Sequence, residues 1–412
     1  PSASPSPSQS PKDRISPKPP TCPSYFRWIH QDLSPWASKG ISRPTLLRAK
    51  PMAAFRLTVI KGRAYLEKYH NVFQTRDVFT LWGILQLLNL YPGRVPDLDL
   101  MFNCEDMPTV RAHDYLGLSG PPPPLFRYCK EDATVDIVFP DWSFWGWPEI
   151  NIKPWVTLSK EIKEGNKKIK WKDRDHHAYW KGNPGVARTR QDLMKCNANK
   201  NKDWNARLYA QDWGKEINKG FKTSDLASQC THRFKIYIEG RAWSVSEKYI
   251  LACDSPTLFV DTRFDDFFTR GLMPGQHYLP IRDNDKCRSI KAAVDWGNAH
   301  QDKAQAIGKA GSNFIQEELK IDYVYDYMLH LLTEYSKLLT YKPTIPENAV
   351  ELCLESMACK AQGRVKEFMT ESMVKSPHDS EPCTMPLPFG TDELKELLER
   401  RANVTAQIER WE

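Results

Sequence analysis

Alternating apolar and polar side chains predict short strands in the first half of the chain. Leu98, Leu100 and Phe102 occupy every second position, as they would in a half-buried strand. The remaining pattern of this half predicts a hairpin over 52–67 that turns at Lys61-Gly62, a helix over 76–93 and a strand over 134–139. An aromatic loop over 140–149 follows that strand.

In the second half, strand-like runs alternate with stretches of helical periodicity. The predicted strands cover 176–182, 233–240, 257–261 and 277–281, and the predicted helices cover 244–253, 286–300, 301–318 and 322–341. Strands that alternate with helices favour parallel sheets with helices on their faces. The fold class is therefore predicted as α/β, with two Rossmann-like domains and no internal sequence repeat.

The same pattern predicts four segments along the chain. Residues 1–20 are rich in proline and serine and are expected to form a disordered stem. Residues 21–175 and 176–345 are the two Rossmann-like domains, and 346–412 form an extension with cysteines and a final helix. A stem of this composition commonly follows a membrane anchor, so a signal anchor is expected upstream of Pro1.

Composition narrows the class of partner. The net charge of +7 is spread along the chain, and the densest basic run, 160–172, also contains Glu161 and Glu164. Nucleic-acid binding would need a concentrated basic stripe with interleaved aromatic residues, whereas an anionic ligand such as a nucleotide diphosphate suits this charge. The fourteen tryptophans suit carbohydrate or nucleotide contact, although core packing is the commoner role of any one of them.

The cysteines indicate an oxidising compartment. Ten cysteines are scattered along the chain without a C-x-x-C pair, which argues against zinc ribbons and thioredoxin-like sites and favours disulfides. The sequon at Asn403 agrees with a lumenal or secreted location.

Three candidate positions follow predicted strands. In parallel sheets, ligands bind beyond the carboxyl ends of the strands, where Asp106, Gly182 and Gly240 are expected. Asp106 is a carboxylate at the end of a strand, and Pro108 prevents the strand from continuing.

Two glycine-led loops are candidate phosphate sites. Gly182 and Asn183 precede a helix that begins with Arg188 and Arg190, so a helix N-terminus and two cations could bind phosphate; an ordinary solvated loop is equally compatible. After Gly240, the Ser244/Glu247 spacing is that of a capping box, which can coexist with phosphate contact.

Metal binding is not predicted. Three D-x-D triplets occur at 97–99, 173–175 and 283–285, a number that chance explains. His176 and His177 beside Asp175 are expected to point to opposite faces of a strand.

The motifs "FPDWSFWGWPE", "YWKGNPGVARTRQDL", "FKIYIEGRAWSVSEKYILACDS", "HYLPI", "AIGKAGSNFIQEEL" and "YVYDYMLHLLTEYSKL" together resemble glycosyltransferase family 90. This family includes Rumi-type protein O-glucosyltransferases and capsule xylosyltransferases. The resemblance covers about residues 22–412, and the cysteine-containing tail is similar to the plant branch. It implies a GT-B-like architecture, an N-terminal acceptor side, a C-terminal UDP-sugar side, inversion at the anomeric carbon and no metal or other cofactor.

The resemblance also implies individual roles. The family's catalytic acid matches Asp106 in the N-x-x-D-x-P stretch, with its neighbour Glu105 as second choice. The family's UDP-facing positions match Gly182 and Arg190, then Gly240 and Ser244, while Asn183 stands where relatives often have Ser. Rumi-type members have Arg where this chain has Ser246. Arg241 or Lys248 is therefore expected to supply the missing cation.

Together these features predict a Golgi or endoplasmic reticulum enzyme that transfers xylose or glucose from a UDP-sugar to a glycan or polysaccharide hydroxyl. Two alternatives stay open: protein O-glucosylation of serine in disulfide-rich repeats, and a non-catalytic nucleotide-sugar-binding or glycan-binding protein. No nucleic-acid partner is expected, and the membrane is expected to be contacted only through the anchor.

Overall fold

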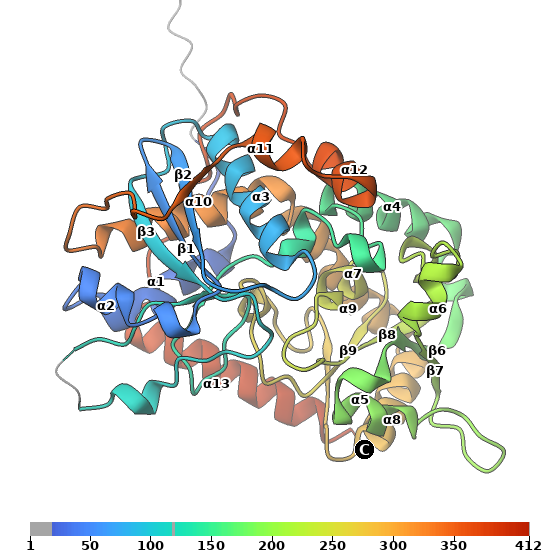
Figure 1. Ribbon diagram of the computed structural model, residues 1–412. Helices are drawn as coiled ribbons and strands as arrows, with labels where there is room; N and C mark the ends of the chain where they lie inside the picture. Colours follow the sequence, from blue (N-terminus) through green and yellow to red (C-terminus); the bar gives the residue numbers. More distant parts are fainter. Residues whose placement is uncertain (1–18, 118–119, 412) are drawn as a thin grey trace, which may run out of the picture.

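The computed structural model describes residues 19–117 and 120–411, so nearly all of the predicted stem lies outside the described residues. The described chain forms two sheets with helices packed around them (Figure 1). The helices are α1 (Trp28–Leu33), α2 (Arg43–Leu47), α3 (Arg76–Leu90), α4 (Trp155–Lys168), α5 (Arg188–Met194), α6 (Trp213–Asn218), α7 (Ser246–Leu251), α8 (Lys286–Ala299), α9 (Gln301–Asn313), α10 (Ile321–Lys337), α11 (Leu354–Ala358), α12 (Gly363–Glu371) and α13 (Thr391–Ile408). None of the helices in the described residues combines the length and the apolar composition of a membrane span.

The first sheet is mixed, contrary to the prediction of a parallel Rossmann-like half. Its strand order is β11-β2-β1-β3-β4-β5. The strands are β1 (Phe55–Ile60), β2 (Arg63–Lys68), β3 (Leu98–Phe102), β4 (Phe126–Arg127), β5 (Ile137–Val138) and β11 (Val350–Leu352). Strand β1 pairs antiparallel with both β2 and β3, and only the β3–β4 and β4–β5 pairs are parallel.

The hairpin prediction for this sheet is confirmed. Lys61 and Gly62 both have positive φ, the backbone geometry of a tight two-residue turn, and the register places Leu57 opposite Leu66. The predicted strand over 134–139 shrinks to the two residues of β5, because Thr134 and Val135 pair with Arg111 and Val110 instead.

The second sheet is parallel throughout, as predicted. Its order is β10-β9-β8-β6-β7, formed by β6 (Asp175–Gly182), β7 (Ala206–Ala210), β8 (His232–Tyr237), β9 (Thr257–Val260) and β10 (Leu279–Ile281). Strands β6 and β8 are neighbours, so the loops after Gly182 and after Tyr237 leave the same edge of the sheet. This juxtaposition brings the two glycine-led loops together.

Packing joins segments that are far apart in the sequence. Gly83 in α3 lets the Trp145 ring lie against the helix, since a Cβ at this glycine would meet the ring at 2.4 Å. The long helix α13 is held to the first half by Arg27, which binds Glu393 with Nη1 and Nη2 each 2.5 Å from a carboxylate oxygen, and its Ile408 packs into the core of the second sheet. Figure 1 shows this red helix running below both halves.

Candidate active site

One cavity contains most of the residues that the sequence singled out. It is bounded by the loops after β3, β6 and β8, by the aromatic loop around the 3₁₀ turn Trp142–Phe144, and by the segment 211–229. The predicted site residues that line it are Asp106, Gly182, Asn183, Arg190, Gly240, Arg241 and Ser244. Residues predicted from distant parts of the sequence therefore share one cavity.

Arg190 is a buried cation at the wall of this cavity. Its side chain donates from Nε to the Glu239 carbonyl at 2.8 Å and from Nη2 to Ser244 Oγ at 3.0 Å. Among the described residues, no carboxylate forms an ion pair with its guanidinium, which is 8% exposed. Burial lowers the pKa of Arg190 from its usual value. A buried cation surrounded by neutral acceptors can bind an anion.

Gly182 is required by close packing. A Cβ at this position would lie 2.5 Å from the Trp180 ring, over which the Arg190 guanidinium is centred at 5.6 Å. Asn183 caps the following turn, because its Oδ1 accepts a hydrogen bond from the Gly185 N–H at 2.8 Å. The first glycine-led loop thus holds Arg190 and its aromatic neighbour in fixed positions.

The second glycine-led loop supplies hydroxyls and an exposed cation. Ser244 Oγ lies 2.8 Å from Ser246 Oγ, and the Ser244 N–H donates to the Tyr237 hydroxyl at 3.2 Å. Arg241 is exposed on the cavity wall and makes no hydrogen bond or ion pair with any described residue. Of the two cations expected to replace the family arginine at position 246, Arg241 is the one at the cavity.

Three predicted binding residues lie elsewhere. Lys248 is 2% exposed and donates to Ser143 Oγ at 2.7 Å and to Asp141 at 3.3 Å, so it belongs to a buried structural ion pair. Glu247 accepts a hydrogen bond from Thr269 at 3.1 Å and forms no capping box, because α7 begins at Ser246 instead of after Ser244. Arg188 is the exposed first residue of α5 and lies outside the cavity lining.

Asp106 also lines the cavity and lies beyond the end of β3. Its Oδ1 accepts a hydrogen bond from Arg76 Nη1 at 2.9 Å, and its side chain is 28% exposed. Within the described residues, Oδ2 of Asp106 has no hydrogen-bond partner. The neighbouring Glu105 is exposed and lies outside the cavity lining. Of the two candidate carboxylates, only Asp106 therefore lines the cavity.

The sequence model of glycosyl transferase family 90 matches residues 17–412. The chain belongs to glycosyl transferase family 90. It is 28% identical over 342 residues to protein O-glucosyltransferase 1 of Bos taurus, covering 79% of this chain and 83% of that protein. It is 27% identical over 342 residues to the Homo sapiens protein of the same name, covering 78% and 82%, and 24% identical over 336 residues to O-glucosyltransferase rumi of Drosophila pseudoobscura pseudoobscura, covering 78% and 79%.

Family 90 membership makes this chain a glycosyltransferase. The non-catalytic alternative is therefore not retained. The relatives are named for glucose transfer, so a nucleotide-sugar donor and a glycan or protein acceptor are the substrates of this class of enzyme. The assignment of individual residues to catalysis and donor binding in this family 90 enzyme remains a prediction.

Tryptophans form much of the cavity wall. The sequence did not indicate which of its tryptophans would do so. Those that line it are Trp142, Trp147, Trp180, Trp213 and Trp243. Trp142 packs edge-on against Trp147 with ring centroids 4.9 Å apart, and Arg76 lies over Trp142 at 4.5 Å. Three of these rings come from loops without a periodic pattern, so only the tertiary fold reveals their common position.

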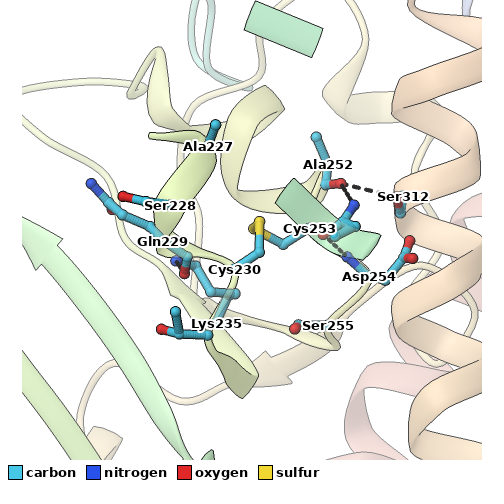
Figure 2. Close-up of a disulfide and its surroundings, with 12 residues drawn as sticks. Ala227, Ser228, Gln229, Cys230, Lys235, Ala252, Cys253, Asp254, Ser255 and Ser312 are labelled. Atoms are coloured by element: carbon cyan, nitrogen blue, oxygen red, sulfur yellow. Dashed lines mark hydrogen bonds between the residues drawn. A yellow bond between two sulfur atoms is a disulfide. The ribbon is translucent and has the colours of Figure 1, made fainter. Parts of the chain in front are cut away.

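A disulfide borders the cavity in this family 90 enzyme. Cys230 is bonded to Cys253, as Figure 2 shows, so the segment that carries Leu226 and Gln229 is joined to the end of α7. The buried Lys235 donates to the Gln229 carbonyl at 2.9 Å, and burial together with the charge of Arg174 lowers its pKa to about 7. Two further disulfides join Cys22 to Cys383 and Cys196 to Cys287, which confirms the prediction of disulfides.

Two of the candidate metal ligands, Asp99 and His177, form contacts with protein side chains. Asp99 forms a buried ion pair with Arg56 at 2.6 Å, and among the described residues none of the six D-x-D carboxylates lines the cavity. The expectation that His176 and His177 point apart is wrong: their rings lie 3.9 Å apart, because the register of β6 is irregular at this point. His177 bonds to Asp175 at 2.5 Å and to Arg207 at 2.6 Å, so both of its ring nitrogens have partners.

Proposed function

We propose that this enzyme transfers a sugar from a UDP-sugar to a hydroxyl of a glycan or polysaccharide, with inversion and without a metal ion. The observation that carries the proposal is that one cavity presents a buried cation without a carboxylate partner, Arg190, and a carboxylate with a free oxygen, Asp106. The leaving diphosphate needs a cation such as Arg190 to stabilise its negative charge. The attacking hydroxyl needs a carboxylate such as Asp106 to accept its proton.

The donor diphosphate is assigned to the edge of the second sheet. Gly240 leaves room for phosphate oxygens beside Arg190, since a Cβ there would lie 3.6 Å from Arg190 Nη2, and Ser244 presents its hydroxyl to the same space. Arg241 provides a second positive charge at the exposed side, in place of the arginine that Rumi-type relatives have at position 246. Together the two cations neutralise the charge that develops on UDP when the glycosidic bond breaks.

The acceptor is assigned to the Asp106 side of the cavity. The acceptor oxygen attacks C1 of the donor sugar from the face opposite UDP, and Oδ2 of Asp106 accepts the proton of that hydroxyl. The C1–O bond to the diphosphate breaks, and UDP leaves with the electron pair. One displacement of this kind inverts the configuration at C1.

The aromatic wall favours a carbohydrate acceptor. Trp147 and Trp213 line the cavity while staying partly exposed, and indole rings present flat apolar faces of the kind that sugar rings pack against. UDP-xylose and UDP-glucose are the proposed donors, as the resemblance to both branches of the family implies.

A second candidate acceptor is the serine hydroxyl of a small disulfide-rich protein domain. The relatives support it, because those that we compared are named protein O-glucosyltransferase or O-glucosyltransferase rumi. Ser246, which replaces an arginine of Rumi-type relatives, argues against assuming that this enzyme has the same substrate as those relatives.

A lumenal location in the Golgi or endoplasmic reticulum, with a type II anchor, is part of the proposal. Three disulfides support an oxidising compartment. Asn403 of the sequon is exposed on α13, where an oligosaccharide could be accommodated.

A donor and acceptor screen tests the proposal. The purified protein is incubated in EDTA with UDP-glucose or UDP-xylose and either neutral oligosaccharides or a folded disulfide-rich domain that contains a serine. We expect UDP release with an oligosaccharide, and NMR of the product should show the β-anomer. Transfer to the protein domain alone would favour the second candidate, and activity that disappears in EDTA would contradict metal independence.

A further inference from the structure

Arg76 donates a side-chain hydrogen bond to the candidate base, Asp106. Arg76 is the first residue of α3, and its Nη1 donates both to Asp106 Oδ1 at 2.9 Å and to the Cys104 carbonyl at 3.2 Å. One guanidinium nitrogen therefore bridges the carboxylate and the backbone of the same loop. This bridge fixes the loop conformation and the carboxylate orientation together.

Aromatic rings hold Arg76 in place. Its guanidinium carbon lies 4.5 Å from the Trp142 ring centroid, 5.2 Å from that of Phe73 and 6.0 Å from that of Trp147. The residue is 6% exposed, so few other rotamers are open to it. A guanidinium held between rings is a rigid donor, whereas a lysine at this position would lack both the planar stacking and the fork of donors.

We propose that Arg76 is a positioning residue for Asp106: it binds Oδ1 and thereby directs Oδ2 toward the acceptor hydroxyl. This inference rests on the proposed function, in which Asp106 accepts the proton. A carboxylate that rotates freely offers its proton-accepting oxygen in the correct direction only part of the time. Misplacement of a reacting group by about 1 Å can cost roughly 100-fold in rate.

A purely structural role for Arg76 makes a different prediction. If the residue only joins α3 to the loop at 103–106, its loss lowers activity whether or not position 106 can accept a proton. If Arg76 acts through Asp106, its loss has no further effect once the carboxylate is gone. A double-mutant cycle separates the two roles.

The experiment measures kcat, KM for the donor and the UDP dissociation constant for Arg76→Met, Asp106→Asn and the double variant. We expect Arg76→Met to lower kcat by about 10- to 100-fold with UDP affinity unchanged, and to lower it no further in the Asp106→Asn background. Arg76→Lys should restore part of kcat, and it replaces Arg76→Met in the cycle if the latter does not fold. The control is Arg233→Met, since Arg233 is also stacked on a tryptophan, Trp171 at 5.4 Å, but lies outside the cavity lining.

If Arg76→Met lowers kcat by the same factor in the wild-type and Asp106→Asn backgrounds, the proposal for Arg76 is overturned. The proposed function is not affected by that result. Full turnover by Asp106→Asn would instead overturn the proposed function, and the role of Arg76 with it. A loss of UDP affinity in Arg76→Met that matches its loss of kcat would also overturn the positioning role, because it would place Arg76 in donor binding.

Discussion

Arg190 is the cation proposed to bind the donor diphosphate. Its charge is buried against carbonyls and a serine hydroxyl, and burial lowers its pKa. Arg190→Met should weaken UDP binding by roughly 1.5–3 kcal/mol, the range for a hydrogen bond to a charged group. Calorimetric titration with UDP in EDTA measures this loss.

Arg188→Met is the matched control, because this arginine lies two residues away on the same helix but is exposed outside the cavity. It should bind UDP like the wild type. Equal affinity of the Arg190→Met variant and the wild type would contradict the assignment of the diphosphate site.

Some residues that the sequence singled out lie at the cavity and others lie away from it, for physical reasons. Gly182 and Arg190 could be predicted because a glycine turn followed by a basic helix start has a local signature. The sequence could not exclude Lys248 from the candidate binding residues, because its ion-pair partner Asp141 lies 107 positions away in the sequence. Arg76 had no local signal, since only the tertiary fold places it beside Asp106.

Two buried carboxyl groups, Glu247 of α7 and Asp266, both accept a hydrogen bond from the Thr269 hydroxyl. Burial raises the pKa of Glu247 well above its usual value and raises that of Asp266 to about 7, and the charge of Asp266 further disfavours ionisation of Glu247. The folded protein thus keeps a proton on Glu247 at a pH at which the unfolded chain releases it. Stability from this group is complete below the unfolded-state pKa and is lost as the pH rises toward the folded-state pKa.

Glu247→Gln keeps an oxygen that can accept the Thr269 hydrogen bond and removes the ionisation. Its melting temperature relative to that of the wild type should therefore rise between pH 5 and pH 8, which thermal scans at several pH values measure. Glu367→Gln, at an exposed glutamate of α12, should show no such trend. Parallel pH profiles for Glu247→Gln and the wild type would contradict the buried, protonated state.

The Cys230–Cys253 disulfide, shown in Figure 2, joins the segment with Leu226 and Gln229, which lines the cavity, to the end of α7. Cys230→Ala/Cys253→Ala should lower UDP affinity several-fold, because the segment with Leu226 and Gln229 must then be ordered when UDP binds. Titration calorimetry measures the effect. Cys22→Ala/Cys383→Ala removes a disulfide outside the cavity lining and should leave UDP affinity unchanged; an equal loss in both pairs would contradict a local role.

The positions of helices and strands were predicted more reliably than the way in which the strands pair. Strand periodicity identified β1, β2, β3, β6, β8 and β9 close to their observed bounds, and helical periodicity did the same for α3, α8 and α10. It could not show that β1 runs antiparallel to β3, because alternation of side chains is the same in both sheet types. For the same reason, a mixed sheet was mistaken for a parallel Rossmann-like half.

The whole molecule is held together by contacts between residues far apart in sequence. Cys22 and Cys383 are 361 positions apart, and β11 from the C-terminal extension pairs with β2 of the first sheet. The four cysteines outside disulfides are Cys104, Cys129, Cys353 and Cys359. The division of the chain into the segments predicted from composition remains a prediction, because the extension packs against both halves.

Thiol counting tests this covalent framework. In denaturant without reductant, the described disulfides predict four reactive thiols, and full reduction should raise the number to ten. Mass spectrometry of the alkylated protein gives both numbers. Ten reactive thiols before reduction would contradict both the disulfides and the lumenal location.

The catalytic role of Asp106 is the central claim and the most directly testable one. Asp106→Asn preserves shape and removes proton acceptance, and Glu105→Gln makes the same change at the exposed neighbour. The measurement is turnover of the UDP-sugar donor together with UDP affinity in both variants. We predict that Asp106→Asn loses about 10²–10⁴-fold in turnover with UDP affinity unchanged, while Glu105→Gln stays active. Normal turnover by Asp106→Asn would contradict the account.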